Sequence, residues 1–119
     1  MTNTNSHTQC LFCKIVRQEI PCEKLFESET ILIFKDIQPQ APMHLLAIPK
    51  EHISDLYQIN SSHQNVLGEI LVESQKLAIQ LGYTNGLRVV NNCLEDGGQT
   101  VHHIHFHILA GRKLSWPPG

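Results

Sequence analysis

The chain has 119 residues, of which 41% are hydrophobic and 17% are charged, and its formal net charge is −2 with neutral histidines. This length predicts one domain, and this composition is that of a globular protein rather than a disordered one. Because the chain has no basic excess, neither a long nucleic acid nor an anionic membrane surface is an expected partner. A small anionic ligand is not excluded, since a few local donors suffice to bind it.

The first residues are polar and lack the apolar segment of a signal peptide. No apolar run approaches the roughly 18 residues that cross a membrane. We therefore expect a cytoplasmic protein, with a disordered tail at residues 1–9 and one domain at residues 10–119. In a reducing compartment the four cysteines are thiols or metal ligands rather than disulfides. They are Cys10, Cys13, Cys22 and Cys93.

The expected elements follow in chain order. Apolar spacing predicts a short helix ended by Pro21 and a long helix over residues 61–81 followed by Gly82. Five segments have the composition of strands: residues 25–27, 31–34, 44–48, 87–91 and 100–109. Residues 92–98 are expected to form a loop. Paired strands around one long helix predict an α+β domain with a mainly antiparallel sheet of about five strands.

The last predicted strand carries the strongest chemical signal in the chain. Side chains alternate between the faces of a strand, so His103, His105 and His107 would share one face. Ile104, Phe106 and Ile108 would line the opposite, apolar face. Three imidazoles in a row pack poorly, because each ring nitrogen needs a hydrogen-bond partner or water. This register therefore indicates a functional site rather than ordinary core packing.

Imidazole can attack phosphorus, transfer protons or bind a metal. Gly97 and Gly98 precede the strand and would let backbone N–H groups approach an anion. Thr100 adds a hydroxyl that can donate to a phosphate oxygen or to a leaving group. These neighbours favour phosphorus chemistry, although the His-x-His spacing alone also fits a metal site.

The segment His103-Ile104-His105-Phe106-His107-Ile108-Leu109 resembles the His-φ-His-φ-His-φ-φ signature of the histidine-triad (HIT) family. Residues 36–44, 48–53 and 96–101, together with the ending Trp116-Pro117-Pro118-Gly119, are similar to the Hint branch of that family. The resemblance covers residues 11–119. It implies a HIT-like fold and a homodimer in which long helices and edge strands pair. Trp116 would then reach the partner's active site.

The resemblance implies a role for each histidine. His105 would attack the α-phosphorus of a purine nucleotide, and water would then release the nucleoside monophosphate from a nucleotidyl-histidine intermediate. His107 and His44 would line the phosphate site, and His103 would support it. Thr100 replaces the usual serine and keeps the hydroxyl that donates a proton to the leaving amine. His102 stands where the family usually has an aromatic residue, and no function is assigned to it.

The resemblance also implies a nucleoside pocket. Asp36 would accept hydrogen bonds from the ribose hydroxyls, as a carboxylate suits a cis-diol. Five apolar residues would form the base pocket: Phe12, Ile15, Ile20, Phe34 and Ile37. Polar contacts around the ribose and phosphate would come from Asn91, Gly98 and Gln99. Each apolar residue could equally be ordinary core packing.

Cys10-x-x-Cys13 has several interpretations. A redox pair lacks its usual βαβ context, and a disulfide is unexpected without export. Bacterial HIT proteins that resemble this chain hold a structural zinc with such a pair and two histidines, here His52 and His103. A four-coordinate Cys2His2 site would be structural, so catalysis would need no cofactor. The remaining interpretation is two reduced surface thiols.

Four functions stay open at this point. The first is hydrolysis of the P–N bond in purine nucleoside 5′-phosphoramidates such as AMP-NH2, AMP-lysine or an aminoacyl-adenylate. The second is hydrolysis of dinucleoside polyphosphates, against which the Hint-like ending argues. The third is a nucleotide-binding or scaffold protein without important turnover. The fourth is a metalloprotein whose triad binds a catalytic zinc, which a chelator would inactivate.

Overall fold

The structure is a computed structural model that describes residues 9–119. The tail predicted for residues 1–9 lies outside the described residues except for Gln9. In chain order the helices and strands are α2 (Leu11–Val16), β1 (Lys24–Glu27), β2 (Ile31–Lys35), β3 (Met43–Pro49), α3 (Gln64–Gln80), β4 (Leu87–Val90), α4 (Leu94–Gly97) and β5 (Phe106–Ala110). Two 3-10 turns, η1 (Leu56–Gln58) and η2 (Ser61–His63), precede α3.

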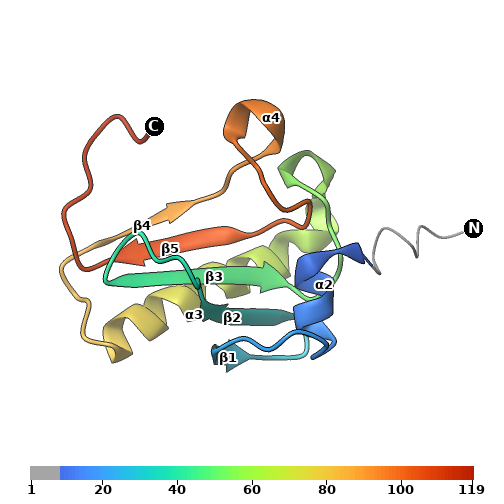
Figure 1. The fold of residues 1–119 in the computed structure, drawn as a ribbon, viewed down its shortest axis with the longest axis horizontal. Helices are drawn as coiled ribbons and strands as arrows, with labels where there is room; N and C mark the ends of the chain where they lie inside the picture. Colours follow the sequence, from blue (N-terminus) through green and yellow to red (C-terminus); the bar gives the residue numbers. More distant parts are fainter. Residues whose placement is uncertain (1–8) are drawn as a thin grey trace, which may run out of the picture.

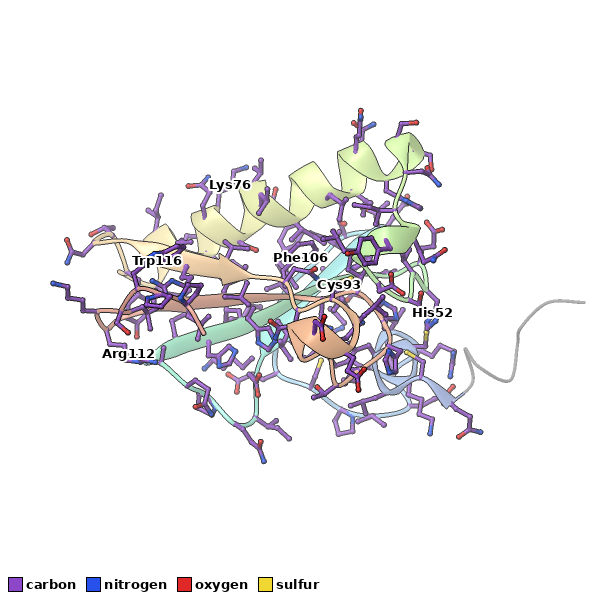
Figure 2. All side chains as sticks on the ribbon, turned by 90° about the horizontal axis from the view of Figure 1, so that it is seen from above. His52, Lys76, Cys93, Phe106, Arg112 and Trp116 are labelled. Carbon is purple, nitrogen blue, oxygen red and sulfur yellow. The ribbon has the colours of Figure 1, made fainter. Side chains whose placement is uncertain are left out.

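The five strands form one antiparallel sheet in the order β1-β2-β3-β5-β4, with α3 lying along one face (Figure 1). The short helix α2 packs against the opposite face at one end of the sheet, as Figure 2 shows with the sheet seen edge-on. This architecture confirms the predicted α+β class, the five-stranded antiparallel sheet and the long helix. No helix in residues 9–119 combines the length and apolar character that a membrane crossing requires.

Strand alternation divides the buried residues into two cores. Ile31, Ile33, Met43, Leu45 and Ile108 face α3 and pack against Ile70, Leu77 and Ala78. Leu32, Phe34, Leu46 and Ile48 face the other way and pack against Phe12 and Ile15 of α2. β3 is buried along its whole length, since it lies in the middle of the sheet and is covered on both faces. His44 alternates with these residues and therefore lies on the face opposite α3.

Two sequence predictions about the region before β5 are wrong. The strand expected over residues 100–109 begins only at Phe106, and the loop expected over residues 92–98 contains the short helix α4. Before Phe106, backbone acceptors are used by side chains: the carbonyl of His103 accepts from His105 Nδ1 and that of His105 accepts from Asn91 Nδ2. In addition, Ile104 N donates to the Ile53 carbonyl, so the backbone of this stretch is bonded to groups outside the β3–β5 ladder.

Candidate active site

The histidine-rich segment crosses from an irregular stretch into β5. His103 and His105 are buried and precede the strand, whereas His107 is half-buried within it. His44 of β3 joins them from the neighbouring strand, because Leu46 pairs with His107 in the ladder and His44 lies two residues away on the same face. The rings of His105 and His107 have centroids 5.2 Å apart, and those of His44 and His107 5.1 Å. The structure thus brings the predicted catalytic imidazoles together.

His105 is held in one tautomer by its own backbone. Its Nδ1 lies 2.8 Å from the carbonyl oxygen of His103, and only an Nδ1–H can donate to that oxygen. The lone pair of the neutral ring is therefore on Nε2. Burial lowers the pKa of His105, while the bond to the His103 carbonyl partly opposes this shift. At neutral pH His105 thus presents an unprotonated, nucleophilic Nε2.

His44 and His107 form a proton-ordered pair. The backbone N–H of Gln40 donates to His44 Nδ1 over 2.9 Å, which places the ring proton of neutral His44 on Nε2. That Nε2 lies 2.9 Å from His107 Nδ1 and 3.4 Å from Asp36 Oδ2. Burial lowers the pKa of both imidazoles, so both are neutral at pH 7. His107 accepts at Nδ1 and is left with an Nε2–H donor.

Asp36, His44 and His107 are close enough to share a metal ion. The hydrogen bonds argue against that use, because His44 would have to bind the ion through Nε2. With Nδ1 accepting from Gln40, Nε2 carries the proton and has no lone pair to give. A metal at this position would require His44 to lose its Gln40 bond. The arrangement therefore favours proton and phosphate chemistry over the catalytic-zinc hypothesis.

Phe12 connects the histidines to the predicted base pocket. Its ring packs edge-on against Phe34, His103 and His105, with centroid separations of 5.8, 6.0 and 5.1 Å. Ile15 and Ile20 line a neighbouring hollow of about 240 Å³ between α2 and β1. Ile37, in the loop after β2, is 93% exposed, so it is available to a ligand rather than part of a core. Asp36 is half-buried beside His44.

The predicted phosphate-side residues lie on the turn around α4. Gln99 is fully engaged there: its amide oxygen accepts from Leu94 N, and its amide nitrogen donates to the carbonyls of Ser54 and Val101. The N–H of Gly98 donates to the Glu95 carbonyl, and Gly98 has a φ of 78° that favours glycine. These groups shape the turn in this structure. Thr100 follows with an exposed side chain.

Asn91 has a definite role that its sequence position did not reveal. Its Nδ2 donates to the His105 carbonyl over 2.9 Å, while its Oδ1 is buried and has no hydrogen-bond partner in the described structure. A buried acceptor without a partner indicates a donor that the structure lacks, such as a ligand hydroxyl or water. Asn91 therefore both fixes the His105 backbone and offers an acceptor beside it.

The predicted metal ligands form a compact cluster between α2 and the histidine segment. Cys10 Sγ and Cys13 Sγ lie 3.4 and 3.5 Å from His103 Nδ1, and Cys13 Sγ lies 3.2 Å from His52 Nδ1. His103 Nε2 donates to the Pro49 carbonyl over 2.8 Å, so its lone pair is on the Nδ1 that faces the sulfurs. In Figure 2, His52 points toward the sulfur atoms at the α2 end of the sheet.

These four side chains fit a tetrahedral zinc ion. Ligand atoms at 2.0–2.3 Å from zinc are separated by roughly 3.3–3.8 Å, close to the separations observed here. Burial raises the pKa of Cys13 to about 12, and the neighbouring Cys10 adds to the shift. A cation bound to both sulfurs would offset this cost and favour the thiolates. Cys22 and Cys93 lie outside the cluster.

Trp116 lies away from the cysteine–histidine cluster. It is 81% exposed and lies at the end of the molecule opposite His52 (Figure 2). A hollow of about 810 Å³ lies between residues 82–88 and 109–114, and its lining contains none of His44, His103, His105 and His107. The site is therefore identified by its chemistry and not by the size of a cavity.

Residues 9–115 match the family described as "Scavenger mRNA decapping enzyme C-term binding". An uncharacterised HIT-like protein of Synechococcus elongatus is 47% identical over 92% of this chain and 96% of its own length. The chain belongs to the histidine-triad family. A HIT family hydrolase from Legionella pneumophila shares the fold with a TM-score of 0.90 and 49% identity, over 93% of this chain and all of that one.

The names of two further similar proteins mention zinc. A 14 kDa zinc-binding protein of Zea mays is 43% identical, covering 92% of this chain and 87% of its own. A zinc-bound histidine triad family protein of Mycobacterium smegmatis has a TM-score of 0.80 and 30% identity, over 92% of this chain and 82% of that one. Proteins similar to this chain thus include one named for zinc binding and a histidine triad protein with bound zinc.

Proposed function

We propose that this HIT protein is a nucleotide hydrolase of the Hint branch that cleaves the P–N bond of purine nucleoside 5′-phosphoramidates. The observation that carries the proposal is the tautomer of His105. Its Nδ1–H is bonded to the His103 carbonyl, so Nε2 is the free nucleophile on a neutral ring. The Trp116-Pro117-Pro118-Gly119 ending, which resembles the Hint branch, supports the choice of substrate.

In the first step, His105 Nε2 attacks the α-phosphorus and a P–N bond forms as the bond to the leaving amine breaks. The amine departs with a proton, for which the Thr100 hydroxyl is the proposed donor. The His107 Nε2–H, held in place by His44, donates to the oxygens on which negative charge develops. In the second step, water attacks phosphorus and returns a proton to the Thr100 oxygen, while the bond from phosphorus to His105 Nε2 breaks. This releases the nucleoside monophosphate and restores the neutral ring of His105.

The substrate would lie between the histidines and the residues of α2 and β2. Asp36 would bind the ribose hydroxyls, and Phe12, Ile15, Ile20, Phe34 and Ile37 would surround the base. The packing of Phe12 on His105 supports this placement, because one ring then borders both the base pocket and the nucleophile. Asn91, Gly98 and Gln99 would complete the wall on the phosphate side.

A structural zinc on Cys10, Cys13, His52 and His103 is part of the proposal. The backbone carbonyl of His103 holds His105 Nδ1, while the His103 side chain faces the two sulfurs. A metal bound there would fix the residue that orients the nucleophile. All four ligand positions would come from the protein, so the zinc would have no open position for chemistry.

The test is hydrolysis of adenosine 5′-phosphoramidate by the wild-type protein and by His105→Ala. His102→Ala is the matched control, because His102 is an exposed histidine in the same segment. We expect turnover by the wild type and the control, and a loss of at least about 10³-fold in His105→Ala, as expected when a covalent nucleophile is removed. A folded wild type that binds AMP without turning over phosphoramidates would instead favour the binding-protein function.

Dinucleoside polyphosphates are the second candidate substrate class. The matched family is named for a decapping enzyme, and the same nucleophile can expel an oxygen leaving group. Comparing kcat/KM for adenosine 5′-phosphoramidate and a diadenosine polyphosphate distinguishes the two. A higher value for the polyphosphate would move the assignment away from the Hint branch.

A further inference from the structure

The loop between β2 and β3, residues 36–42, carries the backbone group that orders the His44–His107 pair. Its own internal bonds are local: Gln38 N donates to Asp36 Oδ1, and Gln40 Nε2 donates to the Gln38 carbonyl. At its start, Asp36 N donates to the His44 carbonyl, whereas residues 37–40 are exposed. The chain that follows β5 supplies the contacts that hold it from outside.

Arg112 is the first of these contacts. Its Nε donates to the Gln40 carbonyl over 2.9 Å. This hydrogen bond connects two residues that are 72 positions apart in the sequence. One guanidinium nitrogen also lies 3.4 Å from the Lys113 carbonyl, which holds the side chain near its own backbone. Arg112 thus contacts the same residue whose N–H donates to His44.

Gly111 is the second contact. Its φ of 99° is one that side-chain-bearing residues rarely adopt. A Cβ at this position would lie 2.7 Å from Pro42 Cβ and 2.9 Å from Tyr83 Cε1, closer than such atoms can approach. The turn after β5 is therefore packed directly against the loop, and this packing positions the backbone of Arg112, the next residue.

Hydrogen bonds connect Arg112 to Gln40, Gln40 to His44, and His44 to His107. Gln40 N donates to His44 Nδ1, and His44 Nε2 then donates to His107 Nδ1. Asp36 Oδ2, 3.4 Å from His44 Nε2, also favours a proton on Nε2. Loss of the Gln40 N–H would therefore weaken the preference of neutral His44 for this tautomer and admit a fraction of the other. The alternative tautomer has no Nε2–H, so His107 would have to reverse its own proton to keep the bond, and its Nε2–H donor would be lost.

We propose that Arg112, placed by the packing of Gly111, is a positioning residue that favours the observed tautomers of His44 and His107 by holding the backbone of Gln40 through its carbonyl. It touches none of the reacting atoms. Its effect on turnover rests on the proposed function, whereas its effect on the tautomers exists without substrate. A role in folding alone would lower the stability of the protein and leave the ring protons where they are.

The experiment compares Arg112→Ala with Lys113→Ala in the full-length protein, with Arg112→Lys as the conservative variant. Lys113 is the neighbouring exposed cation, so both alanine variants lose one positive charge. Long-range ¹H–¹⁵N correlations at pH 8 report which ring nitrogen of His44 and His107 carries the proton. Thermal unfolding and the kinetics of adenosine 5′-phosphoramidate hydrolysis are measured on the same samples.

We expect Arg112→Ala to show mixed tautomers at His44 and His107 and a fall in kcat of roughly fivefold, the scale of one net hydrogen bond, with KM changed less than twofold. Lys113→Ala should match the wild type, and Arg112→Lys should restore part of the wild-type signal because it keeps an N–H donor. Unchanged tautomers in a folded Arg112→Ala protein would overturn the proposal, whatever the activity. Mixed tautomers in a protein without phosphoramidase activity would support the positioning role while contradicting the proposed function.

Discussion

At the scale of single residues, the chemistry of the site depends on which ring nitrogen carries the proton in His44, His105 and His107. The His103 carbonyl fixes His105, and the Gln40 N–H fixes His44. Together these two backbone groups leave a lone pair on His105 Nε2 and a donor at His107 Nε2. A nucleophile and a hydrogen-bond donor on adjacent rings are what attack at a phosphate requires.

The pH dependence of turnover should show that the imidazole rings of His105 and His107 are neutral at pH 7. Burial lowers the pKa of His105 and of His107 below the ordinary value of about 6.5. Since the neutral ring of His105 is the reactive form, kcat/KM should be constant near pH 7 and fall only as the pH drops below 6.5. A pH–rate profile with far-ultraviolet circular dichroism on the same samples checks this. An acid limb centred above pH 6.5 would contradict the account.

If Asp36 binds the ribose as proposed, replacing it should weaken nucleoside binding more than it slows the chemical step. Its Oδ1 accepts from Gln38 N, and its Oδ2 lies 3.4 Å from His44 Nε2. We expect Asp36→Ala to raise KM for the ribonucleotide phosphoramidate about tenfold, as loss of hydrogen bonds to a charged group does, and to affect the 2′,3′-dideoxy substrate much less. Equal effects on both substrates would place the role of Asp36 at His44 instead of at the ribose.

At the scale of elements, much of the fold could be predicted, because apolar spacing predicts α3 and the composition of the segments predicts β1, β2, β3 and β4. The segment before β5 could not, although its alternating pattern resembles a strand. The reason is that His103 and His105 use side-chain and backbone groups to bond one another and their neighbours, which no period-2 pattern reveals. The effect of Gln40 on the His44 tautomer could not be predicted either, because every residue except proline has a backbone N–H.

We expect a bound zinc ion to hold α2 against the histidine segment, because the proposed ligands come from both. We expect the purified protein to contain one zinc per chain, and Cys13→Ser to lose it together with thermal stability and most of the activity. Ligand binding at 1,000 times its Kd contributes about 4 kcal/mol, so the fall in stability should be several kcal/mol. Elemental analysis and thermal unfolding measure both quantities.

Cys22→Ser is the matched control, because Cys22 is a half-buried thiol outside the cluster. It should keep the zinc and the wild-type melting temperature. Full stability and activity in a zinc-free Cys13→Ser protein would show that the four side chains pack adequately without the metal.

At the scale of the whole molecule, the sheet is open at β4. This strand pairs with β5 on one side, and its apolar residues Leu87 and Val89 are about 40% exposed. An unpaired, apolar edge is a surface on which a second strand can be added. We therefore propose that two chains form a homodimer through β4, as the Hint resemblance implies.

Replacing Val89 by glutamate should break this dimer. Light scattering after gel filtration should give twice the chain mass of 13.5 kDa for the wild type and the single chain mass for Val89→Glu. Tyr57→Glu is the control, because Tyr57 is an exposed aromatic residue of η1 away from β4. A wild type that elutes as a single chain would contradict the dimer.

If His105 is the nucleophile, its Nε2 forms a covalent bond to the α-phosphorus during turnover. The most direct measurement is rapid quenching in alkaline denaturant during turnover of adenosine 5′-phosphoramidate, because a phosphorus–nitrogen bond survives in alkali, followed by peptide mass spectrometry at alkaline pH. We expect an adenylyl group on His105 in the wild type and in His102→Ala, and none in His105→Ala. An active wild-type enzyme in which no adduct accumulates on His105, even in single-turnover samples quenched within milliseconds, would contradict it.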